Sequence, residues 1–209
     1  MKLMKIKICG LDPTRDVQLC IDNKVSFLGF VFYKKSPRNI KLKDVKILKS
    51  YNKERSSFVA VCVDPKNDFI KKNLIGNFEY IQLHGSETYK RVVEIKHMGF
   101  KIIKTIKIKN ENHISLYKDF EDIADLILFD STSMEKSQSI PKDLLRKLPK
   151  GKKFGLAGAI NLENIREYSQ LGGFNFLDLS SGLERENLKG YKDHLKIKNF
   201  IKKINELKN

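Results

Sequence analysis

The fold class follows from residues 27–51, which read FLGFVFYKKSPRNIKLKDVKILKSY. The first six residues form a short, continuous apolar run, as expected of a parallel strand that is covered on both faces. A polar loop follows, and residues 42–51 then place apolar side chains at helical spacing. The stretch therefore predicts a strand, a loop and a helix, in that order.

The same alternation repeats along the chain. Seven further apolar runs predict strands at residues 5–9, 58–63, 80–83, 101–106, 126–129, 154–157 and 176–179. Segments of helical character begin near residue 13 and at residues 67, 88, 112, 141, 161 and 193. We therefore expect an α/β protein, a single-domain (β/α)8 TIM barrel over residues 1–209. An open doubly wound sheet is the alternative, but CGLDPT after the first strand lacks the glycine-rich turn of dinucleotide folds.

Composition indicates a folded protein without a membrane span. The chain has 41% hydrophobic and 32% charged residues, and no apolar run approaches the roughly 18 residues of a transmembrane helix. No secretory signal is apparent, so we expect a cytoplasmic protein. Cys9, Cys20 and Cys62 are odd in number and irregularly spaced, which predicts neither disulfides nor a zinc cluster.

The formal net charge is +16, from 41 basic and 25 acidic residues. Such a charge suits nucleic-acid binding, which remains an alternative function. The lysines, however, are spread along the chain and mixed with acidic residues, so we expect neither a nucleic-acid nor a membrane partner. A positive field would also attract a small molecule that carries phosphate or carboxylate groups, and this is the partner we expect.

Chemically useful side chains occur where the predicted strands end, the place at which barrels build active sites. Cys9 ends the first strand, His84 follows the fourth and Asp130 ends the sixth. Each has a simpler interpretation: Cys9 as a small buried apolar residue, Asp130 as a turn or capping residue. Arg38 follows Pro37, and its planar guanidinium suits a carboxylate ligand, although it could equally be a surface arginine.

Two glycine-containing loops predict an anion site. LAGAINLENI (residues 156–165) and DLSSGLE (residues 178–184) both place small residues after a strand, where backbone N–H groups can approach an anion. Gly158 or Gly182 alone could merely shape a turn. Together, after the seventh and eighth strands, they favour phosphate.

The ordered motifs resemble the phosphoribosylanthranilate isomerases of tryptophan biosynthesis. They are KIKICGL, GFVFYKKSPRNI, YIQLHGSE, LILFDS, LAGAINLENI and LDLSSGLE followed by KGYKDHLKIKNFI. The similarity runs nearly from end to end of the chain. A related barrel enzyme acting on another phosphoribosyl compound is the alternative; the histidine-pathway isomerase usually relies on two aspartates, so Cys9 argues against it.

The resemblance implies the Amadori rearrangement of N-(5-phosphoribosyl)anthranilate to 1-(2-carboxyphenylamino)-1-deoxyribulose 5-phosphate, without cofactor or metal. It makes Asp130 the general acid that protonates the furanose ring oxygen and Cys9 the general base that takes the C2′ proton. Arg38 would hold the anthranilate carboxylate, Asp178 would contact a sugar hydroxyl, and His84 would line the mouth. The implied phosphate-binding residues are Gly158, Ala159, Ser180, Ser181 and Gly182.

Both catalytic roles require shifted pKa values, because a carboxyl must keep its proton near neutrality and a thiol must lose one. We expect desolvation to raise the pKa of Asp130 and local positive charge to favour the Cys9 thiolate. Lys7 is expected to point elsewhere, so the sequence names no partner for the thiolate.

Two departures from the family pattern bear on function. The loop after the sixth strand, Ser131 to Pro141, has neither the usual glycines nor the Phe-Asp-Trp sequence, which puts closure over the substrate in doubt. Ala159 replaces the second of two usual glycines, and its methyl group would weaken the phosphate grip if φ is positive there. We expect a monomer, with a homodimer as the alternative.

Overall fold

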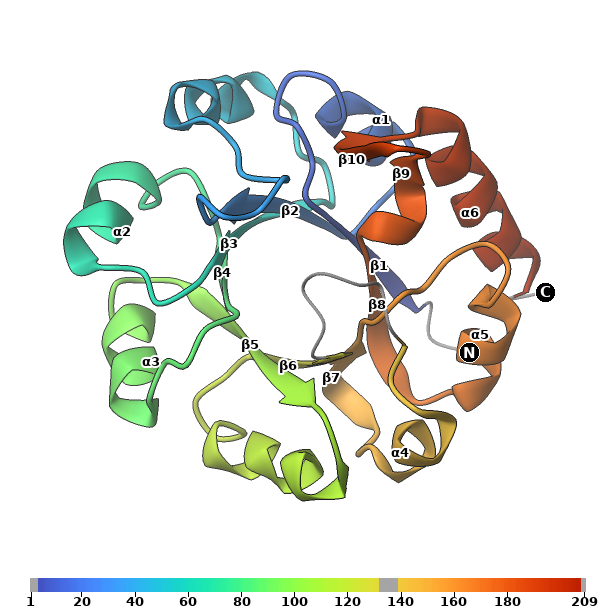
Figure 1. Cartoon of the computed structure of the whole chain (residues 1–209). Helices are drawn as coiled ribbons and strands as arrows, with labels where there is room; N and C mark the ends of the chain where they lie inside the picture. Colours follow the sequence, from blue (N-terminus) through green and yellow to red (C-terminus); the bar gives the residue numbers. More distant parts are fainter. Residues whose placement is uncertain (1–3, 132–138, 208–209) are drawn as a thin grey trace.

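The structure, a computed structural model, describes residues 4–131 and 139–207. Within them, eight parallel strands pair in chain order, and β8 pairs with β1 to close a barrel, seen as the inner ring of Figure 1. The strands are β1 (Lys5–Cys9), β2 (Phe27–Phe32), β3 (Ser57–Cys62), β4 (Tyr80–Leu83), β5 (Lys101–Ile108), β6 (Leu126–Ser131), β7 (Gly151–Leu156) and β8 (Phe174–Leu179). The predicted barrel is confirmed.

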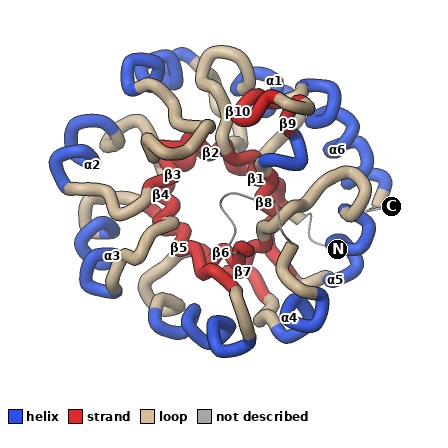
Figure 2. Tube along the Cα trace, in the orientation of Figure 1, coloured by secondary structure: helices blue, strands red, loops and turns tan. Residues whose placement is uncertain are grey.

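Helical segments form the outer ring in the predicted order (Figure 2). They are α1 (Val17–Asp22), η1 (Leu42–Ser50), α2 (Asn67–Asn73), α3 (Tyr89–Lys96), η2 (Glu111–Asp119), α4 (Lys142–Lys147), α5 (Ile165–Leu171) and α6 (His194–Glu206). η1 and η2 are 3₁₀ helices. In η1 the buried Val45 and Leu48 are three residues apart, which matches the 3₁₀ repeat. Across the described residues, no helix is both long enough and apolar enough to span a bilayer.

β1 illustrates how the strands separate two cores. Ile6 and Ile8 pack outward with the helices, whereas Cys9 belongs to the cluster inside the barrel. Lys7 is fully buried and points the same way as Cys9, because residues two apart on a strand share a face. The expectation that Lys7 points elsewhere is therefore wrong.

A hairpin that the periodicity did not predict follows β8. The 3₁₀ turn η3 (Ser181–Leu183) leads into β9 (Glu184–Arg185), which pairs antiparallel with β10 (Leu188–Lys192). Asn187 adopts φ +60° in the connecting turn, a conformation that asparagine tolerates better than most residues. The hairpin buries two charged side chains beside the barrel, Glu184 and Lys192.

Candidate active site

The predicted acid and base come from two non-adjacent strands of one barrel. Cys9 is the last residue of β1, and Asp130 lies near the end of β6. Because all strands of the closed barrel are parallel, their carboxyl ends form a single rim. Both side chains also feel the charges of the same two residues, Lys7 and Asp178. The structure thus brings Cys9 and Asp130 to one polar mouth.

Lys7 occupies the space beside Cys9. Its Nζ atom lies 2.8 Å from Asp178 Oδ2 and also interacts with the Cys9 thiol. A Cβ atom on Gly29 of β2 would lie 3.2 Å from Lys7 Nζ and 3.3 Å from Cys9 Sγ, so the glycine provides room for both groups. Burial opposes the charge on Lys7, but Asp178 and Cys9 raise its pKa above the ordinary value. Asp178 Oδ1 is buried and accepts no hydrogen bond from any described residue.

Asp130 has the properties of a carboxylic acid that keeps its proton. Burial and the nearby Asp178 raise its pKa to about 7, against the opposing hydrogen bond from the Ser131 N–H. His84 Nε2 lies 3.7 Å from Asp130 Oδ2. Burial and three neighbouring lysines lower the pKa of His84 to about 4, so its ring is neutral near pH 7. The pKa shift expected for Asp130 is present.

For the Cys9 thiol, the effect of burial on the pKa exceeds the effect of the nearby positive charges. Burial raises its pKa above the ordinary value, and the positive charge of Lys7 offsets this only in part. In the free protein Cys9 is therefore a thiol near neutral pH. Local positive charge does favour the thiolate, as expected, but the lowered pKa that the base role requires is absent in this state because the side chain is more than nine-tenths buried.

Arg38 is already engaged by a carboxylate of the protein. Its Nε donates to Glu184 Oε1 at 2.6 Å and its Nη2 donates to Glu184 Oε2 at 3.0 Å. Lys192 Nζ also lies 3.3 Å from Glu184 Oε1. Glu184 thus occupies the Nε–Nη2 edge of the guanidinium, which could otherwise bind a substrate carboxylate through two hydrogen bonds. The outer edge, which carries Nη1, is the part left to face a ligand. Arg38 packs across Gly10, where a Cβ would lie 2.5 Å from its Cδ.

The loop after β7 is held by hydrogen bonds to its carbonyl groups. Tyr168 of α5 donates to the Gly158 carbonyl at 3.0 Å, and Asn164 Nδ2 donates to the Ala159 carbonyl at 2.8 Å. In a trans peptide the next N–H points opposite to the carbonyl, so these bonds direct the N–H groups of Ala159 and Ile160 away from α5. Ala159 has φ +50°, the strained conformation in which its methyl group was expected to matter.

The loop after β8 lies against the loop after β7. A Cβ atom on Gly182 would lie 2.2 Å from the Ile160 carbonyl oxygen, so only glycine allows this approach. Ser180 Oγ donates to the Cys9 carbonyl at 3.1 Å, which ties the same loop to the end of β1. The two loops predicted to bind phosphate are therefore neighbours, with Ser181 and Gly182 in η3.

Comparison with known proteins decides the family. The sequence profile of "N-(5'phosphoribosyl)anthranilate (PRA) isomerase" matches residues 6–203. The chain belongs to this isomerase family. N-(5'-phosphoribosyl)anthranilate isomerase of Aquifex aeolicus is 35% identical, with 96% of this chain and 98% of that protein covered. The family resemblance, the isomerase activity and the role in tryptophan biosynthesis that it implied are confirmed.

Solved isomerase structures share the whole fold. The phosphoribosyl anthranilate isomerase of Thermotoga maritima superposes with a TM-score of 0.84 at 26% identity, and 97% of this chain and 99% of that one are covered. Another solved phosphoribosyl anthranilate isomerase, in complex with reduced 1-(o-carboxyphenylamino)-1-deoxyribulose 5-phosphate, gives a TM-score of 0.80 at 26% identity, with the same coverage. The match leaves no large segment of either chain unpaired.

Several residues of this isomerase's mouth escaped the sequence analysis. Lys7 could have been found, because it lies two residues before Cys9 on a strand and must share its face. Glu184 and Lys192 gave no such signal, since the hairpin that carries them has no strong periodicity. In the sequence, Tyr168 occupies an apolar position of a predicted helix, and nothing there indicates its hydrogen bond to the loop after β7. Residues 132–138, most of the atypical loop after β6, lie outside the described residues.

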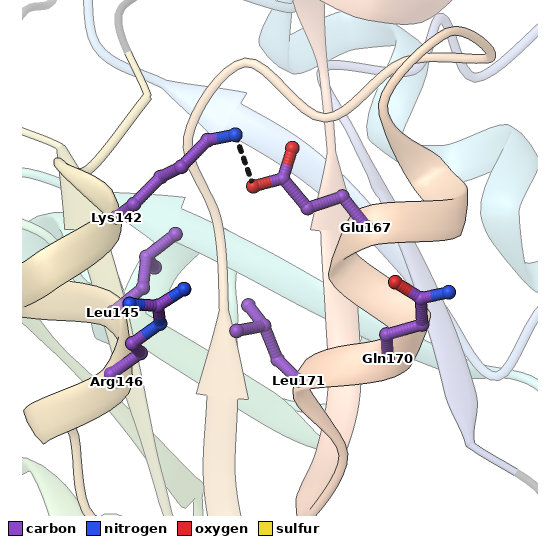
Figure 3. Close-up of a pocket in the computed structure, with 6 residues that line it drawn as sticks. All are labelled: Lys142, Leu145, Arg146, Glu167, Gln170 and Leu171. Atoms are coloured by element: carbon purple, nitrogen blue, oxygen red, sulfur yellow. Dashed lines mark ion pairs between the residues drawn. The ribbon is translucent and has the colours of Figure 1, made fainter.

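A hollow on the outer wall of the isomerase barrel lacks comparable chemistry (Figure 3). It lies between α4 and α5, and Lys142 Nζ pairs with Glu167 Oε1 across it at 2.9 Å. Its lining residues are Lys142, Leu145, Arg146, Glu167, Gln170 and Leu171. Both charged partners are well exposed, so they form an ordinary surface ion pair.

Proposed function

We propose that this isomerase carries out the Amadori rearrangement with Asp130 as general acid and Cys9 as general base. The observation that carries this assignment is the presence, in one barrel mouth, of a carboxyl on β6 whose pKa is about 7 and a thiol at the end of β1. Such a carboxyl still holds a proton at neutral pH and can release it readily, as a general acid must.

In the proposed reaction, Asp130 donates its proton to the furanose ring oxygen. The bond between C1′ and that oxygen breaks, the electron pair goes to the oxygen, and a C1′ iminium forms. Cys9 then removes the proton from C2′, and the C–H electron pair neutralises the iminium to give an enolamine, which tautomerises to the ketone. The positive iminium forms beside Cys9, and it favours the thiolate that burial disfavours in the free protein.

We assign the remaining groups to binding. The buried, unpartnered Asp178 Oδ1 would accept a hydrogen bond from a sugar hydroxyl. His84, neutral and beside Asp130, would line the mouth and donate rather than carry charge. The outer edge of Arg38 would meet the anthranilate carboxylate, with Glu184 fixing its orientation. The phosphate would bind N–H groups and hydroxyls of the loops after β7 and β8, at Gly158, Ala159, Ser180, Ser181 and Gly182.

A fluorescence assay tests the activity directly. Freshly prepared phosphoribosylanthranilate should lose its anthranilate fluorescence faster with the purified protein than without it. Absence of turnover above background would overturn the proposal. We further propose that the protein acts on this small molecule as a monomer, without a nucleic-acid partner, which size-exclusion chromatography with light scattering would test. The cytoplasmic location and the single-domain organisation stay predictions.

A further inference from the structure

Lys7 is a buried cation between two acidic groups. Its side chain has no exposed surface, and its Nζ atom is 2.8 Å from Asp178 Oδ2. Gly29 of the neighbouring strand β2 would, with a Cβ, touch both Lys7 Nζ and Cys9 Sγ, so the two atoms border the same small space. β1 lies between β2, which carries Gly29, and β8, which carries Asp178 (Figure 1).

The charged groups around Cys9 are unequal in number. Four of them act on the Cys9 thiol: Lys7 from β1, Arg38 from the loop after β2, Lys192 from β10 and Asp178 from β8. The fifth, Glu184 of β9, joins the cluster through its ion pairs, which gives three cations and two carboxylates. Glu184 pairs with two of the cations, Arg38 and Lys192, and the third is paired with Asp178. The cluster carries one net positive charge, so ionisation of Cys9 would make it neutral.

We propose that Lys7 is a positioning residue that stabilises the thiolate form of Cys9, with Asp178 holding the Lys7 ammonium in place. The proposal rests on the role of Cys9 as general base. Lys7 is the neighbour that acts most strongly in favour of the thiolate, ahead of Lys192 and Arg38. Because Lys7 is enclosed, its charge is little screened by water. Asp178 has two effects, since it fixes Lys7 but its own charge opposes the thiolate.

These opposing effects predict an order that a merely structural pair would not produce. Removing Lys7 alone should give the largest rise in the pKa of Cys9. Removing both charges should give a smaller rise. Removing only the Asp178 charge should lower the pKa. The variants are Lys7→Met, Lys7→Met with Asp178→Asn, and Asp178→Asn.

The measurement is the pH dependence of Cys9 alkylation by iodoacetamide, followed by mass spectrometry of the Cys9 peptide. At pH 8 we expect Lys7→Met to react at least about tenfold more slowly than the wild type, corresponding to one pKa unit or more. The double variant should fall between them, and Asp178→Asn should react faster than the wild type. If Lys7→Met does not fold, the other two variants still give opposite directions.

Lys104→Met is the matched control. Lys104 is also a buried lysine of a barrel strand, with Nζ 2.6 Å from Glu87 Oε2, but its strand β5 lies four strands away from β1 around the barrel. Its loss should cost stability and leave Cys9 alkylation unchanged. Equal alkylation profiles in the wild type and all Lys7 and Asp178 variants would overturn the proposal. Alkylation does not depend on turnover. A protein that shows the predicted order of alkylation rates but has no isomerase activity would therefore refute the proposed function and leave the role of Lys7 supported.

Discussion

Lys7 Nζ and Asp178 Oδ2 lie 2.8 Å apart in the barrel interior, although 171 residues separate them in the chain. They meet because β8 pairs with β1, with Lys7 opposite Asp178 in the register. The ion pair therefore joins the two strands whose pairing closes the barrel. Its two charges also act on the pKa values of both the proposed acid, Asp130, and the proposed base, Cys9.

Asp130→Asn and Cys9→Ser should each lower kcat by at least about 100-fold, because each removes an acid–base group and leaves its shape nearly unchanged. Steady-state kinetics and circular dichroism would establish that activity, and not folding, is lost. Cys20→Ser provides the control, since Cys20 is also buried but lies in the core between the barrel and the helices. Near-normal kcat in either variant would contradict that residue's assignment.

Asp130 should make the fold less stable as the pH rises. Its unfolded carboxyl titrates near 3.8 and its folded carboxyl near 7, so between these values the folded state holds the extra proton. Its stabilising contribution is complete below about pH 4 and is lost as the pH passes 7. From pH 5 to pH 8 the free energy of unfolding should fall by roughly 2 kcal/mol more in the wild type than in Asp130→Asn. Urea unfolding at both pH values would measure this; parallel curves would argue against it.

Ala159→Gly should stabilise the loop after β7. Ala159 has φ +50°, which costs an alanine about 1 kcal/mol relative to glycine. We expect the free energy of unfolding to rise by up to about this amount, and the KM to stay the same or fall. Ala124→Gly is the control, because this buried alanine has no positive φ and should only lose stability. A lower stability of Ala159→Gly would show that the strain is absent.

Tyr168→Phe should weaken phosphate binding while leaving kcat nearly unchanged. The substitution removes the hydrogen bond that orients the peptide between Gly158 and Ala159. Inhibition by inorganic phosphate should weaken several-fold, and the KM should rise in parallel. Tyr51→Phe deletes a similar hydroxyl bond, to the Pro13 carbonyl at 3.0 Å, outside this loop. Equal effects of the two substitutions would remove any special role for Tyr168.

Arg38→Lys should raise the KM about tenfold with a smaller change in kcat, because lysine cannot satisfy Glu184 and a ligand carboxylate with a planar fork. The same conservative change at the exposed Arg15 should alter neither constant. A fall in kcat at unchanged KM would place Arg38 in the chemical step instead of in binding.

The sequence predicted the strands more accurately than the helices. Continuous apolar runs such as residues 27–32 are strands because only a buried parallel sheet covers both of their faces. η1 was expected as an ordinary helix, and its 3₁₀ form depends on how Val45 and Leu48 pack against the barrel. The β9–β10 hairpin was missed, because its residues acquire their pairing only from the surrounding elements.

The sequence by itself determined the alternation of strands and helices, and with it which residues reach the mouth, because strand ends are local features of the chain. Only the tertiary structure decided their chemical state. Cys9 keeps its proton and Arg38 is bound to Glu184 because burial and charge depend on residues brought from distant parts of the chain. Desolvation and Coulomb interactions act through space, so they cannot be predicted from the pattern of residues along the chain.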